Sequence, residues 1–167
     1  MTRTESREIL TDLRAIPKHM IEAWNRGDAA GFAHACTDTT DFIAFEGTHL
    51  VGREGIIAFH QPLFDSVLAG SRLHGDVRFV RLLGADWAII HAYVDVVLPG
   101  HVRPSPGRTS MQLFVVHREL GEWRIEAVQN CRQVTLERQL LLDDIDSLPS
   151  RAQELLAQLL GAIPNEV

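Results

Sequence analysis

Four stretches with the two-residue alternation of β-strands follow one another in the second half of the chain, and they restrict the fold more than any other feature. We expect strands over residues 73–83, 87–98, 109–118 and 123–134. Turn signals at 84–86 and 120–122 separate the first two and the last two strands. The Pro- and Gly-rich segment PGHVRPSPGR forms a longer loop between the middle two. This arrangement predicts an antiparallel meander.

The residues that precede the meander have the periodicity of helices. Apolar side chains recur at steps of four and three at Ile9, Leu13, Ile16, Met20 and Trp24. Pro17 lies inside this stripe, so we expect a break or kink there and a second helix beginning near it. Gly27 is expected to end the helix, and Asp28 to cap a short helix over residues 29–36.

A short strand pair and a further helix are expected between these helices and the meander. Residues 41–52, DFIAFEGTHLVG, predict two strands that turn at Glu46 and Gly47, and residues 53–70 predict a helix that Pro62 interrupts. Helices followed by an antiparallel meander are typical of an α+β fold rather than of a parallel βαβ fold. We therefore expect a strongly curved, mostly antiparallel sheet wrapped around the N-terminal helices.

The C-terminal end of the chain has a pattern of its own. Ser150 and Gln153 form a capping box ahead of a Leu-rich stripe that ends at Ile163. We predict one domain over residues 1–135 and a helical extension over residues 136–167, packed on the core or on a partner chain. The acidic run DDIDS in this extension is interpreted as a solvated turn and not as a metal site.

The charge of the chain argues against nucleic acid as a partner. The net charge is −6 and the isoelectric point is about 5.7, and the sequence has no evident basic patch. No apolar run approaches the roughly 20 residues of a membrane span, and the charged N-terminus does not have the pattern of a signal peptide. Cys36 and Cys131 lack metal-ligand spacing, so we expect two reduced, buried thiols in a cytoplasmic protein; the alternative is a disulfide between them.

The common catalytic signatures are absent from the sequence. It contains no GxGxxG after a strand, no Walker loop, no GxSxG and no HExxH. A nicotinamide or flavin enzyme built on a dinucleotide-binding fold is therefore not expected. None of the eight histidines forms a pair with metal-ligand spacing. We expect neither a cofactor nor a metal site.

The segment GEWRIEAVQNCRQ, residues 121–133, begins as a half-buried strand and ends in polar side chains. Asn130 and Arg132 lie on one face of it, and Gln112 interrupts the apolar pattern of the preceding strand. We interpret the polar end as the lining of a cavity; the alternative is that the strand runs past the core into solvent. His60, one helical turn before Phe64, either faces the same cavity or is a core histidine.

The strand over residues 87–98 has two unlike faces. One carries Trp87, Ile89, His91, Tyr93 and Asp95, and the other carries Ala88, Ile90, Ala92, Val94 and Val96. The second face is plain core. The first is either an exposed face with a tryptophan at one end or a pocket wall whose polar end lies near the opening. A register error of one residue would exchange the two faces.

Three segments resemble the SgcJ/EcaC family of the nuclear transport factor 2-like, or SnoaL-like, superfamily: AWNRGDAAGFAHAC, VGREGIIAFHQPLFDSVLAGSRL and HRELGEWRIEAVQNCR. The resemblance covers residues 16–134. It implies a cone-shaped α+β (cystatin-like) roll with a pocket at its open end, and a homodimer formed through the sheet. Relatives of this family occur in gene clusters for enediyne and other polyketide natural products.

The resemblance also implies a chemistry. Cyclases and isomerases of the superfamily use one pocket acid or base to move a proton next to a carbonyl, and they place an aspartate on the early strand pair. This chain has DFIAFEG there, so only Asp41 or Glu46 is available. The polar side chains on otherwise apolar strands, taken with this resemblance, lead us to hypothesise an enzyme or enzyme accessory that acts on a hydrophobic polyketide- or polyene-like molecule. The alternative is a non-catalytic small-molecule-binding or carrier protein of the same fold.

Roles in the enzyme hypothesis follow from side-chain chemistry. His91 is the expected acid or base, because an imidazole titrates near neutral pH. Tyr93, Gln112 and Asn130 are expected to donate hydrogen bonds to a carbonyl or enolate oxygen. Arg132 is expected to attract an acidic group. The expected ligand-binding residues are Trp24, Phe45, His60, Phe64, Gln112 and Arg132.

Overall fold

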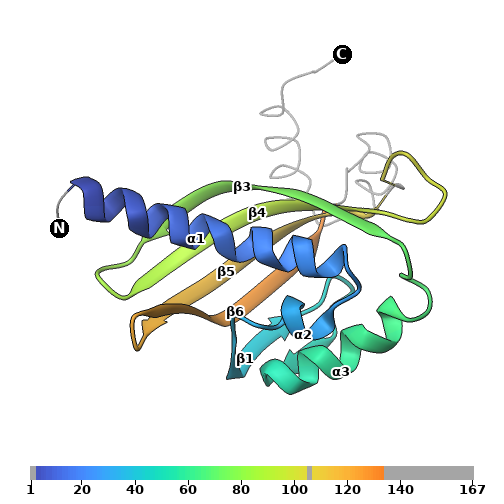
Figure 1. Cartoon of the computed structure of the whole chain (residues 1–167), viewed down its shortest axis with the longest axis horizontal. Helices are drawn as coiled ribbons and strands as arrows, with labels where there is room; N and C mark the ends of the chain where they lie inside the picture. Colours follow the sequence, from blue (N-terminus) through green and yellow to red (C-terminus); the bar gives the residue numbers. More distant parts are fainter. Residues whose placement is uncertain (1–2, 105–106, 134–167) are drawn as a thin grey trace, which may run out of the picture. The chain divides into compact units, whose positions relative to one another are not determined.

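A computed structural model describes residues 3–104 and 107–133 of the chain (Figure 1). The helical extension expected over residues 136–167, with its capping box and acidic run, lies outside the described residues. The helices are α1 (Arg3–Trp24), α2 (Ala29–Phe32) and α3 (Gly52–Phe64), and the strands are β1 (Cys36–Ile43), β2 (His49–Val51), β3 (Arg72–Leu82), β4 (Trp87–Val97), β5 (Thr109–Glu119) and β6 (Glu122–Arg132). None of these helices is long and apolar enough to cross a membrane.

All six strands form one curved sheet in the order β2-β1-β6-β5-β4-β3. The expected antiparallel meander is confirmed, because β3 to β6 pair antiparallel with their sequence neighbours. The one parallel contact joins β1 to β6. The helices lie along one face of the sheet (Figure 1). This confirms the expected α+β fold, a curved and mostly antiparallel sheet with the helices on one face.

Helix α1 differs from the expectation at Pro17. The helix is continuous through this residue rather than broken there. The Pro17 side chain is fully buried, so the burial of its ring offsets the backbone hydrogen bond that a proline cannot donate. The expected stripe is confirmed, since Leu13, Ile16 and Met20 are buried.

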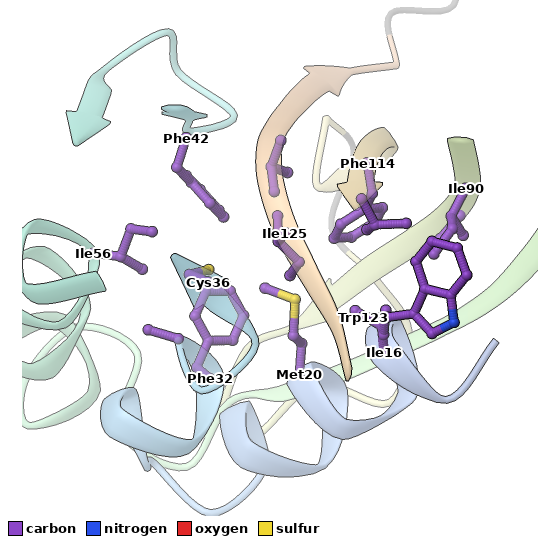
Figure 2. Close-up of a cluster of buried hydrophobic side chains, with 14 of the residues drawn as sticks. Ile16, Met20, Phe32, Cys36, Phe42, Ile56, Ile90, Phe114, Trp123 and Ile125 are labelled. Carbon is purple, nitrogen blue, oxygen red and sulfur yellow. The ribbon is translucent and has the colours of Figure 1, made fainter. Parts of the chain in front are cut away.

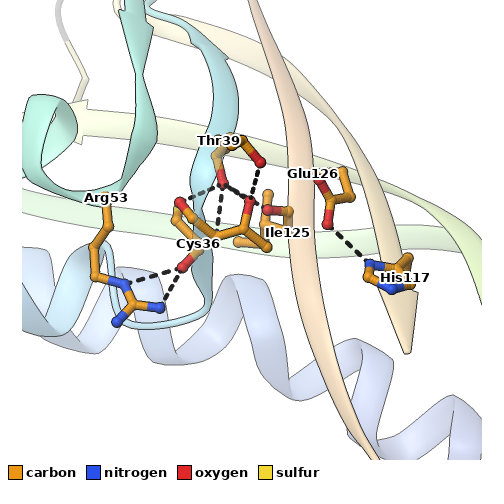
Figure 3. Close-up of polar contacts among 8 residues, drawn as sticks. Cys36, Thr39, Arg53, His117, Ile125 and Glu126 are labelled. Carbon is orange, nitrogen blue, oxygen red and sulfur yellow. Dashed lines mark hydrogen bonds and ion pairs between the residues drawn. The ribbon is translucent and has the colours of Figure 1, made fainter. Parts of the chain in front are cut away.

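Strand β1 begins earlier than expected, at Cys36, and α2 is correspondingly short. The Thr40 hydroxyl donates to the Ile125 carbonyl at 2.6 Å, so this polar side chain bonds β1 to β6. The Arg53 guanidinium donates twice to the Cys36 carbonyl, at 3.0 and 2.7 Å (Figure 3). These contacts fix the first residues of β1 against both β6 and α3.

The core lies between the helices and the concave face of the sheet (Figure 2). The face of β4 expected to be core is buried, from Ala88 to Val94, and α1 packs over this part of the sheet. Cys36 is buried and free as expected. Cys131 is also free but exposed, contrary to the expectation, because it lies on the opposite face of β6 from Asn130.

Candidate functional site

A cavity of about 280 Å³ lies between the helices and the concave face of the sheet. Its walls come from the C-terminal end of α1, from α2 and α3, and from five of the six strands. The principal apolar lining residues are Trp24, Phe32, Phe42, Phe45, Phe59, Leu63, Leu73 and Val94, and the polar ones are Glu46, His60, Arg108, Ser110, Gln112 and Asn130. Apolar walls with a few convergent polar groups are typical of small-molecule sites.

Helix α3 places His60 in the wall of this cavity, where the side chain is only 5% exposed. Its Nδ1 lies 2.8 Å from the carbonyl oxygen of Ile56, one turn earlier on the helix. A carbonyl oxygen only accepts, so Nδ1 carries the hydrogen of the neutral ring. Nε2 is then a hydrogen-bond acceptor, and the hydrogen bond at Nδ1 is the one that the described residues make with this ring.

Aromatic rings surround this imidazole. The centroids of Phe32 and Phe59 lie 4.7 and 5.2 Å from that of His60, and those of Trp24, Phe42 and Phe64 lie within 6.3 Å. Burial among these rings lowers the pKa of His60 from its ordinary value of 6.5, although the Ile56 carbonyl and the charge of Glu46 oppose the shift. His60 is therefore a neutral base at neutral pH.

Gln112 and Asn130 are the second polar element of the site. They are direct partners in the antiparallel ladder of β5 and β6, and both line the cavity. Gln112 is 7% exposed, and its side chain faces the cavity. The Asn130 Oδ1 is buried and has no hydrogen-bond partner among the described residues. A buried acceptor without a hydrogen bond lowers the stability of the fold, which favours a partner supplied by a ligand.

The sequence hypothesis placed His91 and Tyr93 in the pocket, and the structure does not bring them there. Both lie on the opposite face of β4 from Ala92 and Val94, on the outer side of the sheet. The His91 ring stacks on Phe79 with centroids 4.1 Å apart, and the Arg78 guanidinium lies 4.6 Å from the centroid of the Tyr93 ring. Of the two readings of this face, the exposed one is therefore correct.

Most of the other predicted residues do come together. Trp24, Phe45 and His60 line the cavity, as Gln112 and Asn130 do. Phe64 is buried behind this wall, with its ring 5.0 Å from Trp24. Arg132 is exposed and is not part of the lining, but its guanidinium lies 4.6 Å from the centroid of Phe45. The polar end of β6 is thus partly cavity wall at Asn130 and partly rim at Arg132.

The two early carboxylates have different positions. Glu46, in the turn between β1 and β2, lines the cavity, although its side chain is also exposed to solvent. Asp41 is exposed and bonds to the His49 imidazole at 2.7 Å. Glu46 is therefore the carboxylate of the early strand pair that reaches the site.

Arg108 and Ser110 line the cavity but were not among the predicted residues. Their signal is the alternation of β5, since residues 108, 110 and 112 fall on one face if the strand pattern is extended backwards. The backbone supports this extension, because the Val96 amide donates to the Arg108 carbonyl at 3.2 Å. The Pro- and Gly-rich composition before Thr109 predicts a loop, so the sequence pattern does not assign Arg108 to the strand face.

No family model matches the chain, and no curated protein matches it. Among solved structures it is similar to a domain of unknown function with a cystatin-like fold from Nostoc punctiforme PCC 73102. The sequences are 44% identical, the match covers 97% of this chain and 98% of that one, and the TM-score is 0.76. Sequence identity of 44% over nearly the full length of both chains shows that they belong to one family.

Two more distant structures share only the fold. An NTF-2-like protein of unknown function from Shewanella oneidensis MR-1 is 18% identical, with 72% of this chain and 97% of that one covered and a TM-score of 0.61. A ketosteroid isomerase-like protein from Erwinia carotovora atroseptica SCRI1043 is 17% identical, with 75% and 97% covered and a TM-score of 0.62. Both likenesses confirm the nuclear transport factor 2-like architecture.

Proposed function

The chain belongs to the same family as the Nostoc punctiforme domain with a cystatin-like fold, and we propose that its cavity binds a hydrophobic small molecule and moves a proton on it. The observation that carries this proposal is His60. It is a buried, neutral imidazole with its Nδ1–H bonded to the helix and its Nε2 left without a protein partner among the described residues. A base of this kind has its lone pair available to a bound ligand.

The reaction that fits this arrangement is removal of a proton from a carbon next to a carbonyl group. His60 takes the proton at Nε2, and negative charge then develops on the ligand oxygen. The Gln112 amide N–H is a donor for that oxygen, and the unpaired Oδ1 of Asn130 accepts from a ligand hydroxyl or enol. Return of the proton to another carbon completes an isomerisation or assists a ring closure.

The class of substrate is a second part of the proposal. Aromatic side chains form much of the cavity wall, which suits a flat, conjugated molecule. The sequence resemblance to the SgcJ/EcaC family and the fold shared with a ketosteroid isomerase-like protein support the same class. We propose that the chain belongs with the SgcJ/EcaC proteins and that its ligand is a polyketide- or polyene-like intermediate.

One observation favours a second candidate, a non-catalytic binding or carrier protein. The partner of His60 Nδ1 is a backbone carbonyl and not a carboxylate, and burial lowers the pKa of the ring. Both features weaken His60 as a base. In this alternative the same cavity binds a ligand and releases it without chemical change.

The two candidates separate in a proton-exchange experiment. The probe is 2-tetralone, a flat aromatic ketone with acidic α-protons, incubated with the protein in D₂O and followed by NMR. Catalysis by His60 predicts α-deuteration well above the buffer rate in wild type. It also predicts at least a tenfold loss of this rate in His60→Gln. Binding measured by calorimetry shows whether each protein holds the ketone.

Two further outcomes complete the test. Wild type that binds 2-tetralone without exchanging its protons faster than buffer overturns the catalytic proposal and favours the carrier. The matched control is His91→Gln, which removes a histidine from the outer face of the sheet. This control is expected to exchange at the wild-type rate.

We also propose that the protein is a homodimer formed through the outer face of the sheet. Phe79 and Trp87 are large apolar side chains exposed by 46% and 43% on β3 and β4. Half-buried Met111, Leu113 and Val115 continue this apolar surface on β5. These apolar side chains share the outer face with His91 and Tyr93, and apolar surface exposed in this way supports a protein–protein interface.

A further inference from the structure

The concave sides of β5 and β6 change in polarity from the core to the mouth of the cavity. On β5 the order is buried Phe114, then Gln112, Ser110 and finally Arg108. On β6 the order is buried Val128, Asn130 and Arg132. The ladder pairs Gln112 with Asn130 and Ser110 with Arg132, so the same order runs along both strands. A molecule bound along them would contact apolar, neutral polar and cationic groups in succession.

The two arginines at the mouth have no carboxylate partner among residues 3–104 and 107–133. Three Lys or Arg side chains and two histidines lie against carboxylates in the part of the chain that the structure describes, and none of these pairs includes Arg108 or Arg132. Arg132 is held against the Phe45 ring, with its guanidinium 4.6 Å from the ring centroid. The guanidinium stacks on this cavity-lining ring and donates no hydrogen bond to an acceptor of the described residues. Its N–H groups are therefore available to a ligand.

The charge at this mouth is opposite to that of the whole chain. Glu46 is the only carboxylate among the described residues that line the cavity, whereas Arg108 and Arg132 contribute two positive charges beside it. The chain as a whole has a net charge of −6. A cationic rim over an apolar cavity in an acidic protein is a feature that selects for an anionic group on the ligand.

We propose that the ligand is a hydrophobic acid whose carboxylate binds Arg108 and Arg132 at the mouth while its apolar body enters the cavity. This inference rests on the proposed small-molecule function and adds the charge and orientation of the ligand. Asn130 and Arg132 are two residues apart on one strand face, so their Cα atoms are about 7 Å apart. The ligand's acidic group is therefore expected nearer the mouth than the atom that reaches Asn130.

A pair of matched probes tests the charge requirement. The first is 2-naphthylacetate, which is ionised at pH 7 because carboxyl groups have pKa values near 4. The second is 2-naphthylacetamide, which has the same shape and no charge. Calorimetry measures both against wild type, against the double variant Arg108→Met with Arg132→Met, and against Arg81→Met. Arg81 is an exposed residue of β3 outside the cavity and serves as the control.

The expected result is that wild type and the Arg81 control bind the acid at least tenfold more tightly than the amide. The double variant is expected to bind both probes with the amide's affinity, which also shows that it is folded. Equal wild-type affinity for acid and amide overturns the charge requirement but leaves the proposed pocket standing. A preference that persists in the double variant, or that disappears in the Arg81 control, also overturns it. Binding of neither probe to wild type contradicts the pocket itself, and this inference falls with it.

Discussion

Gln112 on β5 lies directly opposite Asn130 on β6, and both amides face the same cavity. Their neighbours toward the core, Phe114 and Val128, are paired in the same way and are fully buried. The cavity therefore begins where this double row changes from hydrocarbon to amide. Because the Asn130 Oδ1 has no partner among the described residues, the free protein keeps a destabilising group at this boundary.

Replacement of Asn130 by leucine is expected to stabilise the free protein. The change removes a buried, unpaired acceptor and fills part of an apolar cavity, so the free energy of unfolding should rise by about 1 kcal/mol. Urea unfolding of wild type and Asn130→Leu measures this difference. Affinity for 2-naphthylacetamide should fall in the same variant, since the ligand loses a polar partner.

Asn25→Leu is the matched control for that substitution. The Asn25 amide donates to the Leu73 carbonyl at 3.0 Å and accepts from the Leu73 amide at 2.7 Å. Leucine there leaves both backbone groups without these partners, so we expect a loss of about 1–3 kcal/mol. A loss of similar size in Asn130→Leu would mean that Asn130 has a structural partner and is not poised for a ligand.

The protonation of His60 is expected to make stability depend on pH. Burial places the folded-state pKa below the unfolded value of 6.5. The contribution of His60 to stability is therefore complete above pH 6.5 and is lost as the pH falls toward the folded-state pKa, because the unfolded chain binds the proton first. Urea unfolding at pH 7.5 and 5.0 should show a smaller loss in His60→Gln than in wild type. Equal losses would show that His60 titrates normally in the fold.

Two glycines at the start of α3 are expected to respond in opposite ways to alanine. Gly52 has φ of +70°, and a methyl group on it would overlap the carbonyl oxygen of Asp38. Gly55 has no atom within 4 Å of such a methyl group. Gly52→Ala should lower the free energy of unfolding by more than about 2 kcal/mol, whereas Gly55→Ala should raise it by about 0.5–1 kcal/mol. Thermal and urea unfolding of the two variants check this contrast.

The proposed dimer predicts an effect of charge on the outer face of the sheet. Leu113 lies beside His91 in the ladder, on the outer face of β5. Wild type should have twice the chain mass of 18.7 kDa, and Leu113→Glu should have the mass of one chain. Light scattering during size-exclusion chromatography measures both masses. Ala58→Glu, on the exposed side of α3, should leave the mass unchanged. A wild-type monomer at micromolar concentration contradicts the dimer.

The sheet and the part of the site on β5 and β6 can be predicted from the alternation of side chains along the strands. Asn130 and Gln112 interrupt the apolar faces of β6 and β5. Because side chains alternate between the two faces of a strand, both must lie on the same side as Phe114 and Val128. The same logic extends to Ser110, two residues before Gln112. These residues belong to strands whose concave faces are plainly apolar, which leaves little ambiguity about direction.

Parity alone cannot assign His91, since both faces of β4 are rich in apolar side chains. The choice is made by long-range packing. Ala88 and Ala92 are small and fully buried on the side that faces the helices, whereas larger side chains such as Ile89 and Tyr93 occupy the outer side. The role given to His91 consequently passes to His60, whose position depends on how α3 packs against β1.

The central claim is that the cavity beside His60 is the functional site, and a crystal structure of the protein soaked with 2-tetralone tests it most directly. We expect the ketone to lie between the His60 ring and the Gln112–Asn130 pair. Its oxygen should lie within hydrogen-bond distance of an amide, and an α-carbon should face Nε2. A ketone bound instead beside His91 and Tyr93 on the outer face, or in the hollow lined by His19, His34 and Trp123, would contradict the account.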